Sequence, residues 1–127
     1  MVKHLPYRYR DYSTMAAEAS LAARDQGKFR EMHLLLLDRS PALDRANLVA
    51  YAKELKLDVN RFTKDLDAMR HNTEIDRDLK LAEGLDLYNT PTIFINGVKL
   101  LGDRPFEAYK AVIDQELKAA GSGGKKP

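Results

Sequence analysis

The sequence has no cysteine among its 127 residues. A chain without cysteine cannot form a disulfide of its own, present a thiolate nucleophile or hold a metal through sulfur. The absence also removes the residue type from which the redox compartment of a protein is usually inferred. This exclusion constrains the function more than any motif in the chain does.

The chain also lacks a strong charge of one sign. It has 21 basic and 19 acidic side chains, and Lys125 and Lys126 lie in the glycine-rich C-terminal stretch, which leaves 19 basic (21 minus 2) against 19 acidic residues before it. A neutral body lacks the basic surface that supplies most non-specific affinity for nucleic acids and anionic membranes. We therefore expect neither nucleic acid nor a membrane as partner.

Long hydrophobic runs are absent as well. The longest is Leu34 to Leu37, whereas a membrane-spanning helix needs about 20 apolar residues. The N-terminus shows no charged and then apolar signal pattern, so the sequence as it stands predicts a soluble chain without a targeting signal. Its length and its 44% hydrophobic content predict one globular domain over residues 1–120, followed by a flexible tail over residues 121–127.

Helical periodicity occupies the middle of the chain, from residue 13 to about residue 85. Apolar residues recur there at i, i+3, i+4 and i+7, the spacing of one buried helix face. Ser13, Asp44 and Asp58 stand where N-cap residues are preferred. The predicted helices span residues 14–26 and 28 to about 38, then follow Asp44, Asp58 and Asn72 in turn, the last ending before Gly84.

Strand patterns flank these helices. Val2 to Leu5 is predicted as a short strand that ends at Pro6, where proline cannot continue a ladder. Residues 92–95 and 98–101 are predicted as two strands around Asn96-Gly97, the dipeptide favoured in a type I′ hairpin turn. Pro105 suits the first turn of a final helix. The order of elements predicts an α/β protein.

The segment from Thr90 to Gly97 resembles the Thr-Pro-Thr-x-x-x-Asn-Gly signature of DsbA-like thioredoxin-fold oxidoreductases. Around it, residues 2–6 resemble the strand that follows the active-site helix of that family. Gln26 to Phe29, with Met32 and His33, resemble a recurrent segment of its helical insertion. The likeness extends from Val2 to about Leu117. It implies a thioredoxin-like fold with a helical insertion at about 13–85 and a C-terminal hairpin and helix at 91–118.

The resemblance also implies a substrate-binding loop. Thr90-Pro91 would be a cis peptide bond, which only X-Pro bonds form at small cost. In that family the loop faces the catalytic cysteines, and the residue before the proline pairs with an extended substrate peptide, a form of β-augmentation. Thr90, Pro91 and Thr92 are therefore the candidate site residues.

The sequence departs from the family at its redox motif. The family's first strand and its Cys-x-x-Cys helix would precede Met1, and no serine, lysine or histidine can replace a thiolate in disulfide exchange. We therefore expect a redox-inactive chain with no catalytic residue and no cofactor. Its parent family acts on cysteine-containing proteins and is typically periplasmic or otherwise extracytoplasmic, a location that only the resemblance implies.

In the family, the first strand lies between the strand at Val2 to Leu5 and the hairpin. Without it, buried backbone groups would lack partners, so the gap would close by rearrangement, by exchange with a second copy or by a partner's strand. We expect a swapped homodimer formed by strand exchange. The alternative function is a non-catalytic module that binds peptides or assembles with a partner. A weaker alternative is kinship with kappa-class glutathione transferases, which also need an upstream catalytic residue.

Other residue patterns favour structural roles. The histidines at positions 4, 33 and 71 do not have ligand spacing, so no metal site is expected. The alternation from Tyr7 to Arg10 could stack on a single strand of nucleic acid, but a loop whose tyrosines cover a helix edge explains it better. The carboxylates at positions 65, 67, 74, 76 and 78 are expected on a solvated face with weak ion pairs.

Overall fold

The computed structural model describes residues 1–7 and 12–123. The chain divides into two compact units, unit 1 (Met1–Gly84) and unit 2 (Leu85–Pro127). The division coincides with the predicted end of the helical insertion near residue 85. The expectation that residues 1–120 form one domain stays a prediction.

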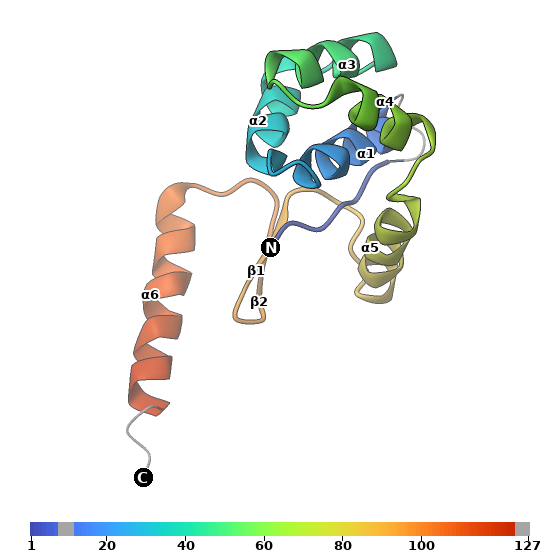
Figure 1. Cartoon of the computed structure of the whole chain (residues 1–127). Coiled ribbons are helices and arrows are strands. Elements are labelled where there is room, and N and C mark those ends of the chain that lie inside the picture. The colour runs from blue at the N-terminus through green and yellow to red at the C-terminus, as the bar shows by residue number, and fades with distance from the viewer. Residues whose placement is uncertain (8–11, 124–127) are drawn as a thin grey trace. The chain divides into compact units, whose positions relative to one another are not determined.

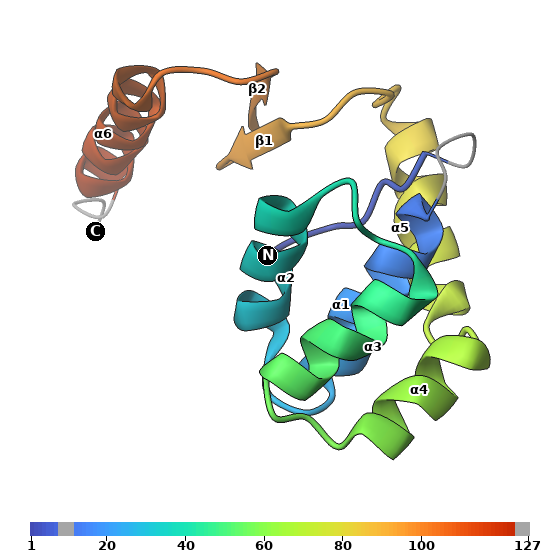
Figure 2. The same cartoon turned by 90° about the horizontal axis from the view of Figure 1, so that it is seen from above.

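Unit 1 is built around a central helix. Helix α1 contacts each of the other four helices of the unit (Figure 2). Its Ala19, Ala22 and Ala23 are fully or almost fully buried, and such small side chains let neighbouring helices pack closely against it. The helices of the unit are α1 (Ser13–Arg24), α2 (Phe29–Arg39), α3 (Arg45–Glu54), α4 (Val59–Asp67) and α5 (Asn72–Gly84).

The hydrophobic core fills the space between α1, α2, α3 and α4. Met32, Leu48 and Phe62 each come from a different helix and have no exposed surface. Around them lie buried residues that include Leu36, Tyr51 and Leu66. The Tyr51 hydroxyl donates a hydrogen bond to the Ala42 carbonyl oxygen at 2.7 Å, so the one polar group of this ring is satisfied.

Of the three predicted N-cap residues, one caps its helix with a side-chain hydrogen bond and two do not. Asp58 caps α4 as predicted, since its carboxylate accepts a hydrogen bond from the Arg61 backbone N–H at 3.0 Å. The Ser13 prediction is wrong: Tyr12 occupies the N-cap position of α1 with φ 64°, and the Ser13 hydroxyl accepts from the Tyr7 backbone N–H instead. Asp44 stands at the N-cap of α3 but accepts no backbone N–H there.

The predicted strand at Val2 to Leu5 is not formed. The strands in the described ranges are β1 (Thr92–Ile95) and β2 (Val98–Leu101), which pair with each other. A strand needs a neighbouring ladder, whereas here the His4 backbone N–H donates to a carboxylate oxygen of Asp78 on α5 at 2.9 Å. At His4, the backbone N–H is therefore bonded to a side-chain carboxylate and not to the carbonyl of a neighbouring strand.

Unit 2 contains the hairpin and the last helix (Figure 1). The strands are antiparallel, and Ile95 faces Val98 across the turn. Asn96 and Gly97 both have positive φ, at 48° and 84°, as a type I′ turn requires. The hairpin prediction is therefore confirmed.

Helix α6 (Phe106–Gly123) follows the hairpin and packs against β1. It contains Gly121 to Gly123, the first three residues of the stretch that the sequence predicts as a flexible tail. Residues 124–127, the rest of that stretch, lie outside the described residues.

The two units differ sharply in burial. Among the residues whose burial the structure describes, the buried ones all lie in unit 1, and none of residues 85–121 is buried. The fully buried apolar surface, which contributes most per residue to the hydrophobic free energy of folding, therefore lies in unit 1.

Candidate functional site

The predicted site residues Thr90, Pro91 and Thr92 lie together at the start of β1. The peptide bond between Thr90 and Pro91 is cis. The Pro91 carbonyl oxygen accepts a hydrogen bond from the Gly102 backbone N–H at 2.9 Å, and the Thr92 hydroxyl donates to the Asn89 carbonyl oxygen at 2.7 Å. These contacts fix the loop to the hairpin and to the residues before it.

The hydrogen bond between Pro91 and Gly102 sets which backbone groups of β1 face outward. Facing pairs in an antiparallel ladder alternate between hydrogen-bonded and non-hydrogen-bonded. In the observed register, Ile93 and Ile95 therefore direct their N–H and C=O groups toward β2. Thr92 and Phe94 direct theirs to the other edge, which has no partner strand among residues 1–7 and 12–123. We call these outward groups of Thr92 and Phe94 the binding edge.

The binding edge has no charged residue. Strand β1 reads Thr-Ile-Phe-Ile, whereas β2 contains Lys99. Ile93 is 37% exposed and Phe94 is 47% exposed. An uncharged and partly exposed edge strand is a template for pairing with another polypeptide. The sequence pattern located the loop but not Phe94, because the direction of its backbone groups depends on the register of the hairpin.

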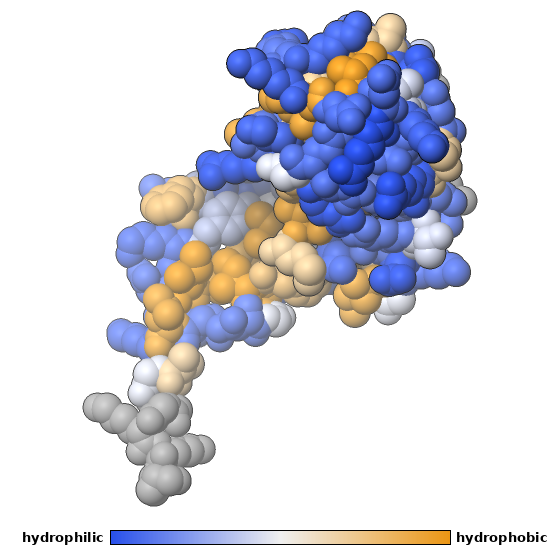
Figure 3. Space-filling model, viewed as in Figure 1, coloured by the Kyte–Doolittle hydropathy of each residue, from blue (hydrophilic) through white to orange (hydrophobic). Residues whose placement is uncertain are grey.

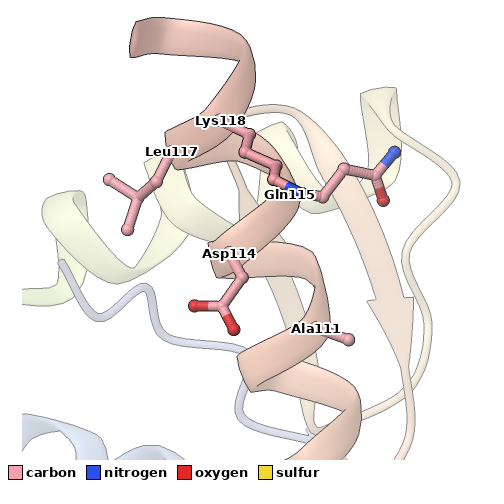
Figure 4. Close-up of a pocket in the computed structure, with 5 residues that line it drawn as sticks. All are labelled: Ala111, Asp114, Gln115, Leu117 and Lys118. Atoms are coloured by element: carbon pink, nitrogen blue, oxygen red, sulfur yellow. The ribbon is translucent and has the colours of Figure 1, made fainter.

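Two surface hollows in the described part of the chain do not form a second candidate site. One is lined by Ala111, Asp114, Gln115, Leu117 and Lys118, all from α6. Figure 4 shows Leu117 and Gln115 on opposite sides of that helix, so these side chains do not converge on a ligand. Another hollow of about 300 Å³ lies between α1 and α5. It is open to solvent and has no cluster of charged groups at its rim.

A group of buried polar residues joins α1 to α5 in unit 1. The Glu18 side chain is fully buried, and its carboxylate accepts a hydrogen bond from the His71 backbone N–H at 2.9 Å. The His71 Nε2 atom lies 2.9 Å from a carboxylate oxygen of Asp25. Burial raises the pKa of the Glu18 carboxyl above its ordinary value, and the hydrogen bond from His71 opposes that shift.

Two of the carboxylates expected on a solvated face are buried. Asp65 is 7% exposed and Asp78 is 4% exposed. Each has cationic neighbours: Arg70 lies 3.2 Å from Asp65, and Lys3 lies 3.4 Å from Asp78. The expectation is wrong for these two because ion pairing and hydrogen bonds let a carboxylate enter a partly apolar environment.

The burial of Glu18 could have been predicted from its position in the helical pattern. Glu18 is three residues after Met15 and four before Ala22, so it lies on the same helical stripe as apolar residues. A charged residue on such a stripe is expected to be buried with a hydrogen-bond partner.

The histidines of unit 1 have packing contacts. The Phe29 ring stacks on the His33 ring with 5.6 Å between ring centroids, and it forms a T-shaped contact with the His4 ring at a centroid distance of 6.2 Å. Burial lowers the pKa of His4, while Asp78 acts in the opposite direction. In the part of the chain that the structure describes, no group of three or more potential ligand residues could hold a metal. The stretch Tyr7 to Arg10 lies mostly outside the described residues.

Comparison with known proteins places the chain in a family. The model of the DSBA-like thioredoxin domain matches residues 4–114. A solved thioredoxin-like oxidoreductase from Silicibacter pomeroyi has a TM-score of 0.80 and 26% identity, and the likeness covers 91% of this chain and 66% of that one.

Curated relatives are much longer than this chain. The Na(+)/H(+) antiporter NhaA 3 of Salinispora tropica is 38% identical over an alignment of 129 positions. The alignment covers 98% of this chain and 20% of that protein. The antiporter NhaA of Herminiimonas arsenicoxydans is 38% identical over 114 residues, with 90% and 18% covered. The chain thus spans about a fifth of their length. None of its described helices meets the length and apolarity needed to cross a membrane.

The family match covers most of the chain, and the solved neighbour has a TM-score of 0.80 over 91% of it. The fold is therefore thioredoxin-like with a helical insertion, as the sequence predicts. The chain belongs to the family of DSBA-like thioredoxin domains.

Proposed function

We propose that this chain is a DsbA-like module that binds an extended polypeptide along its binding edge and performs no thiol chemistry itself. The observation that carries the proposal is the pair of outward-facing residues, Thr92 and Phe94, on an uncharged strand directly after Pro91. Their backbone groups match the hydrogen-bonding pattern of an added strand. Thr90, Pro91 and Thr92 would orient the peptide at the start of the edge.

The absence of thiol chemistry follows from composition. The chain has no cysteine, and disulfide exchange requires attack by a thiolate on a disulfide sulfur. We therefore expect that the isolated chain does not increase the rate at which dithiothreitol reduces insulin. Catalysis by the pure chain would contradict this part of the proposal.

A second candidate function is that of a part of a thiol-disulfide oxidoreductase. The solved neighbour is named an oxidoreductase, and this chain covers 66% of it. In this alternative, cysteines in another segment would act on a substrate that the Thr90 to Thr92 loop presents. Sodium and proton exchange, which the names of the longer relatives describe, is not part of either proposal.

The expected ligand is an extended peptide with few charges. Main-chain hydrogen bonds would supply affinity, and side chains that alternate between the two faces would supply selectivity. An acidic or basic residue beside Ile93 or Phe94 would lose hydration without gaining a partner of opposite charge on β1. Peptides rich in valine and threonine suit both the extended conformation and the apolar strand.

A labelled peptide of alternating valine and threonine tests the proposal by fluorescence anisotropy. The variant Phe94→Pro removes the outward N–H, and proline is tolerated on an edge strand where the N–H faces outward. The matched control Phe94→Ala removes the same aromatic ring but keeps that N–H. We expect binding to fall about tenfold more in the proline variant than in the alanine variant.

The ligand can be altered in the same assay. Methylation of the peptide's backbone nitrogens removes its donors and should abolish binding to the unmodified chain. Equal affinity for methylated and unmethylated peptides, or equal losses in the proline and alanine variants, would contradict binding by strand addition. Circular dichroism of each variant checks that the helical unit is intact.

A further inference from the structure

The turn of the hairpin consists of an asparagine followed by a glycine. Of the asparagines at positions 47, 60, 72, 89 and 96, only Asn96 is followed by glycine. Asn96 and Gly97 are both exposed, whereas the strands that they connect carry apolar side chains (Figure 3). No described atom beyond the neighbouring residues lies within 4 Å of a Cβ added at Gly97. Water and base therefore reach this peptide bond without obstruction.

The backbone nitrogen of Gly97 is a nucleophile within reach of the Asn96 side-chain amide. Ile95 and Val98 are the pair that closes the turn, so the Gly97 N–H stands outside the ladder. Glycine has no Cβ to obstruct an approach to its nitrogen, and its backbone is freer than that of any other residue. Within residues 1–7 and 12–123, the Asn96 side chain is held by no hydrogen bond. The two groups can therefore meet when the turn fluctuates.

We propose that Asn96 is a site of spontaneous deamidation, at which the turn converts itself to a succinimide and then to an acid. The Gly97 nitrogen attacks Cγ of Asn96 and forms a new C–N bond. The bond from Cγ to Nδ2 breaks, and the proton of the attacking N–H leaves with Nδ2 as ammonia. Water then opens the ring at either of its carbonyl carbons and gives aspartate or isoaspartate. The reaction consumes one water, releases one ammonia and needs no oxidant or cofactor.

Other side-chain amides of the chain lie in settings that oppose this reaction. The asparagines at positions 47, 60 and 72 lie in helices α3, α4 and α5, where the backbone is fixed by the helix. The nitrogen that follows the second of these belongs to Arg61, whose N–H donates to the Asp58 carboxylate. Gln26 precedes Gly27, but its side-chain nitrogen and oxygen are both hydrogen-bonded to the Asp58 backbone. The open turn at Asn96 therefore differs from all four.

Isoaspartate would change the hairpin more than aspartate would. Its main chain runs through the former side-chain carboxyl carbon, so the backbone of the turn gains a CH₂ group. The pairing of Ile95 with Val98 depends on the length and type of this turn, and the longer backbone would loosen it. Hydrogen exchange of the Ile93 amide should then be faster in the isoaspartate form than in the unmodified chain. Equal exchange would overturn this consequence.

Mass spectrometry of the full chain, incubated in warm and mildly alkaline buffer, tests the inference. Trypsin releases residues 81–99 as one peptide, which contains Asn96 and a matched control, Asn89. Asn89 is also exposed and outside any helix or strand, but the β-branched Thr90 follows it and crowds the attacking nitrogen. Fragmentation of the peptide should find the acid at position 96 and the intact amide at position 89. An isoaspartyl methyltransferase should methylate the incubated chain and not the fresh chain.

A double variant that exchanges the two turn residues, Asn96→Gly with Gly97→Asn, is the matched protein control. It keeps the composition, and the order glycine-asparagine also suits a two-residue hairpin loop. The attacking nitrogen would then belong to Val98, which is part of the ladder and β-branched, so the turn should keep its amide. Equal deamidation at positions 89 and 96, or in the unmodified and exchanged chains, would overturn the inference. The comparison within one peptide decides even if the exchanged turn opens.

Discussion

The buried carboxylate of Glu18 on α1 accepts the backbone N–H of His71, the residue that directly precedes α5, at 2.9 Å. This hydrogen bond connects two helices that are 53 residues apart in sequence. It also places an ionisable group in the interior of unit 1, where the charged form is disfavoured. Stability should therefore depend on pH through this residue.

Glu18→Gln is expected to flatten the dependence of stability on pH. Burial raises the pKa of Glu18 above the ordinary 4.5, so the folded state binds this proton more tightly than the unfolded state. Its contribution is fully present below the unfolded pKa and is lost as pH rises through the folded pKa. Glutamine keeps an acceptor for His71 but does not ionise.

Urea unfolding at about pH 5 and about pH 8 measures this effect through the free energy of unfolding. The loss of stability between the two conditions should be smaller in Glu18→Gln than in the unmodified chain. Glu83→Gln, on the exposed side of α5, controls for the removal of one negative charge. The same pH dependence in all three proteins would show that Glu18 does not titrate differently in the folded state.

The ion pair between Arg24 and Glu74 should have the opposite dependence on pH. The two terminal guanidinium nitrogens of Arg24 donate to the Glu74 carboxylate, at 2.6 and 2.9 Å, and this hydrogen bonding lowers the pKa of Glu74. A lowered carboxyl pKa gives stability that is present above the unfolded pKa and lost as pH falls. Both side chains are more than a third exposed, so solvent screening limits the effect.

A double-mutant cycle with Arg24→Gln and Glu74→Gln measures that pair. We expect a coupling of about 0.5 to 1 kcal/mol at neutral pH, and a smaller one in high salt. A coupling that is unchanged in high salt would argue against an electrostatic origin.

Phe62→Ala should destabilise unit 1 strongly. The ring has no exposed surface, and removal of a buried phenylalanine side chain costs about 3 to 5 kcal/mol. Leu37→Ala on α2 is the control, since Leu37 is 66% exposed and its loss should cost less than about 0.5 kcal/mol. Chemical denaturation followed by circular dichroism distinguishes the two, and similar losses would mean that the core is misassigned.

Gly97→Ala should loosen the hairpin. Gly97 has φ 84°, a conformation that costs a residue with a side chain about 1 kcal/mol. Hydrogen exchange of the Ile93 and Leu100 amides reports local opening, because these residues form a hydrogen-bonded pair. Gly84→Ala in α5 is the contrasting variant: no neighbouring atom lies within 4 Å of its added Cβ, and it should leave the hairpin amides unchanged.

The hairpin was predictable because its determinants are local. Asn96 and Gly97 tolerate the positive φ angles of the turn, and alternation fixes which residues face each other. The Thr90 to Thr92 loop was located by resemblance to a family signature. Its outward groups could be assigned only from the observed bond between Pro91 and Gly102.

The mispredicted features depend on residues distant in sequence. Residues 2–5 have an acceptable strand composition, but no described strand pairs with them, and the His4 N–H donates to the side chain of Asp78. The Ser13 hydroxyl could serve as an N-cap acceptor, but it accepts a hydrogen bond from the Tyr7 backbone N–H instead. Asp65 and Asp78 became buried through cationic neighbours that helical periodicity does not reveal.

The separation of burial between the two units has a consequence for sequence variation. In the described part of the chain, the buried residues all lie before Leu85, whereas the binding edge lies at Thr92 to Phe94. If the edge binds a polypeptide as we propose, substitutions on it can alter the binding preference without touching the buried core of unit 1. On that proposal, single changes in β1 would be a route to a new binding preference that leaves the buried core unchanged.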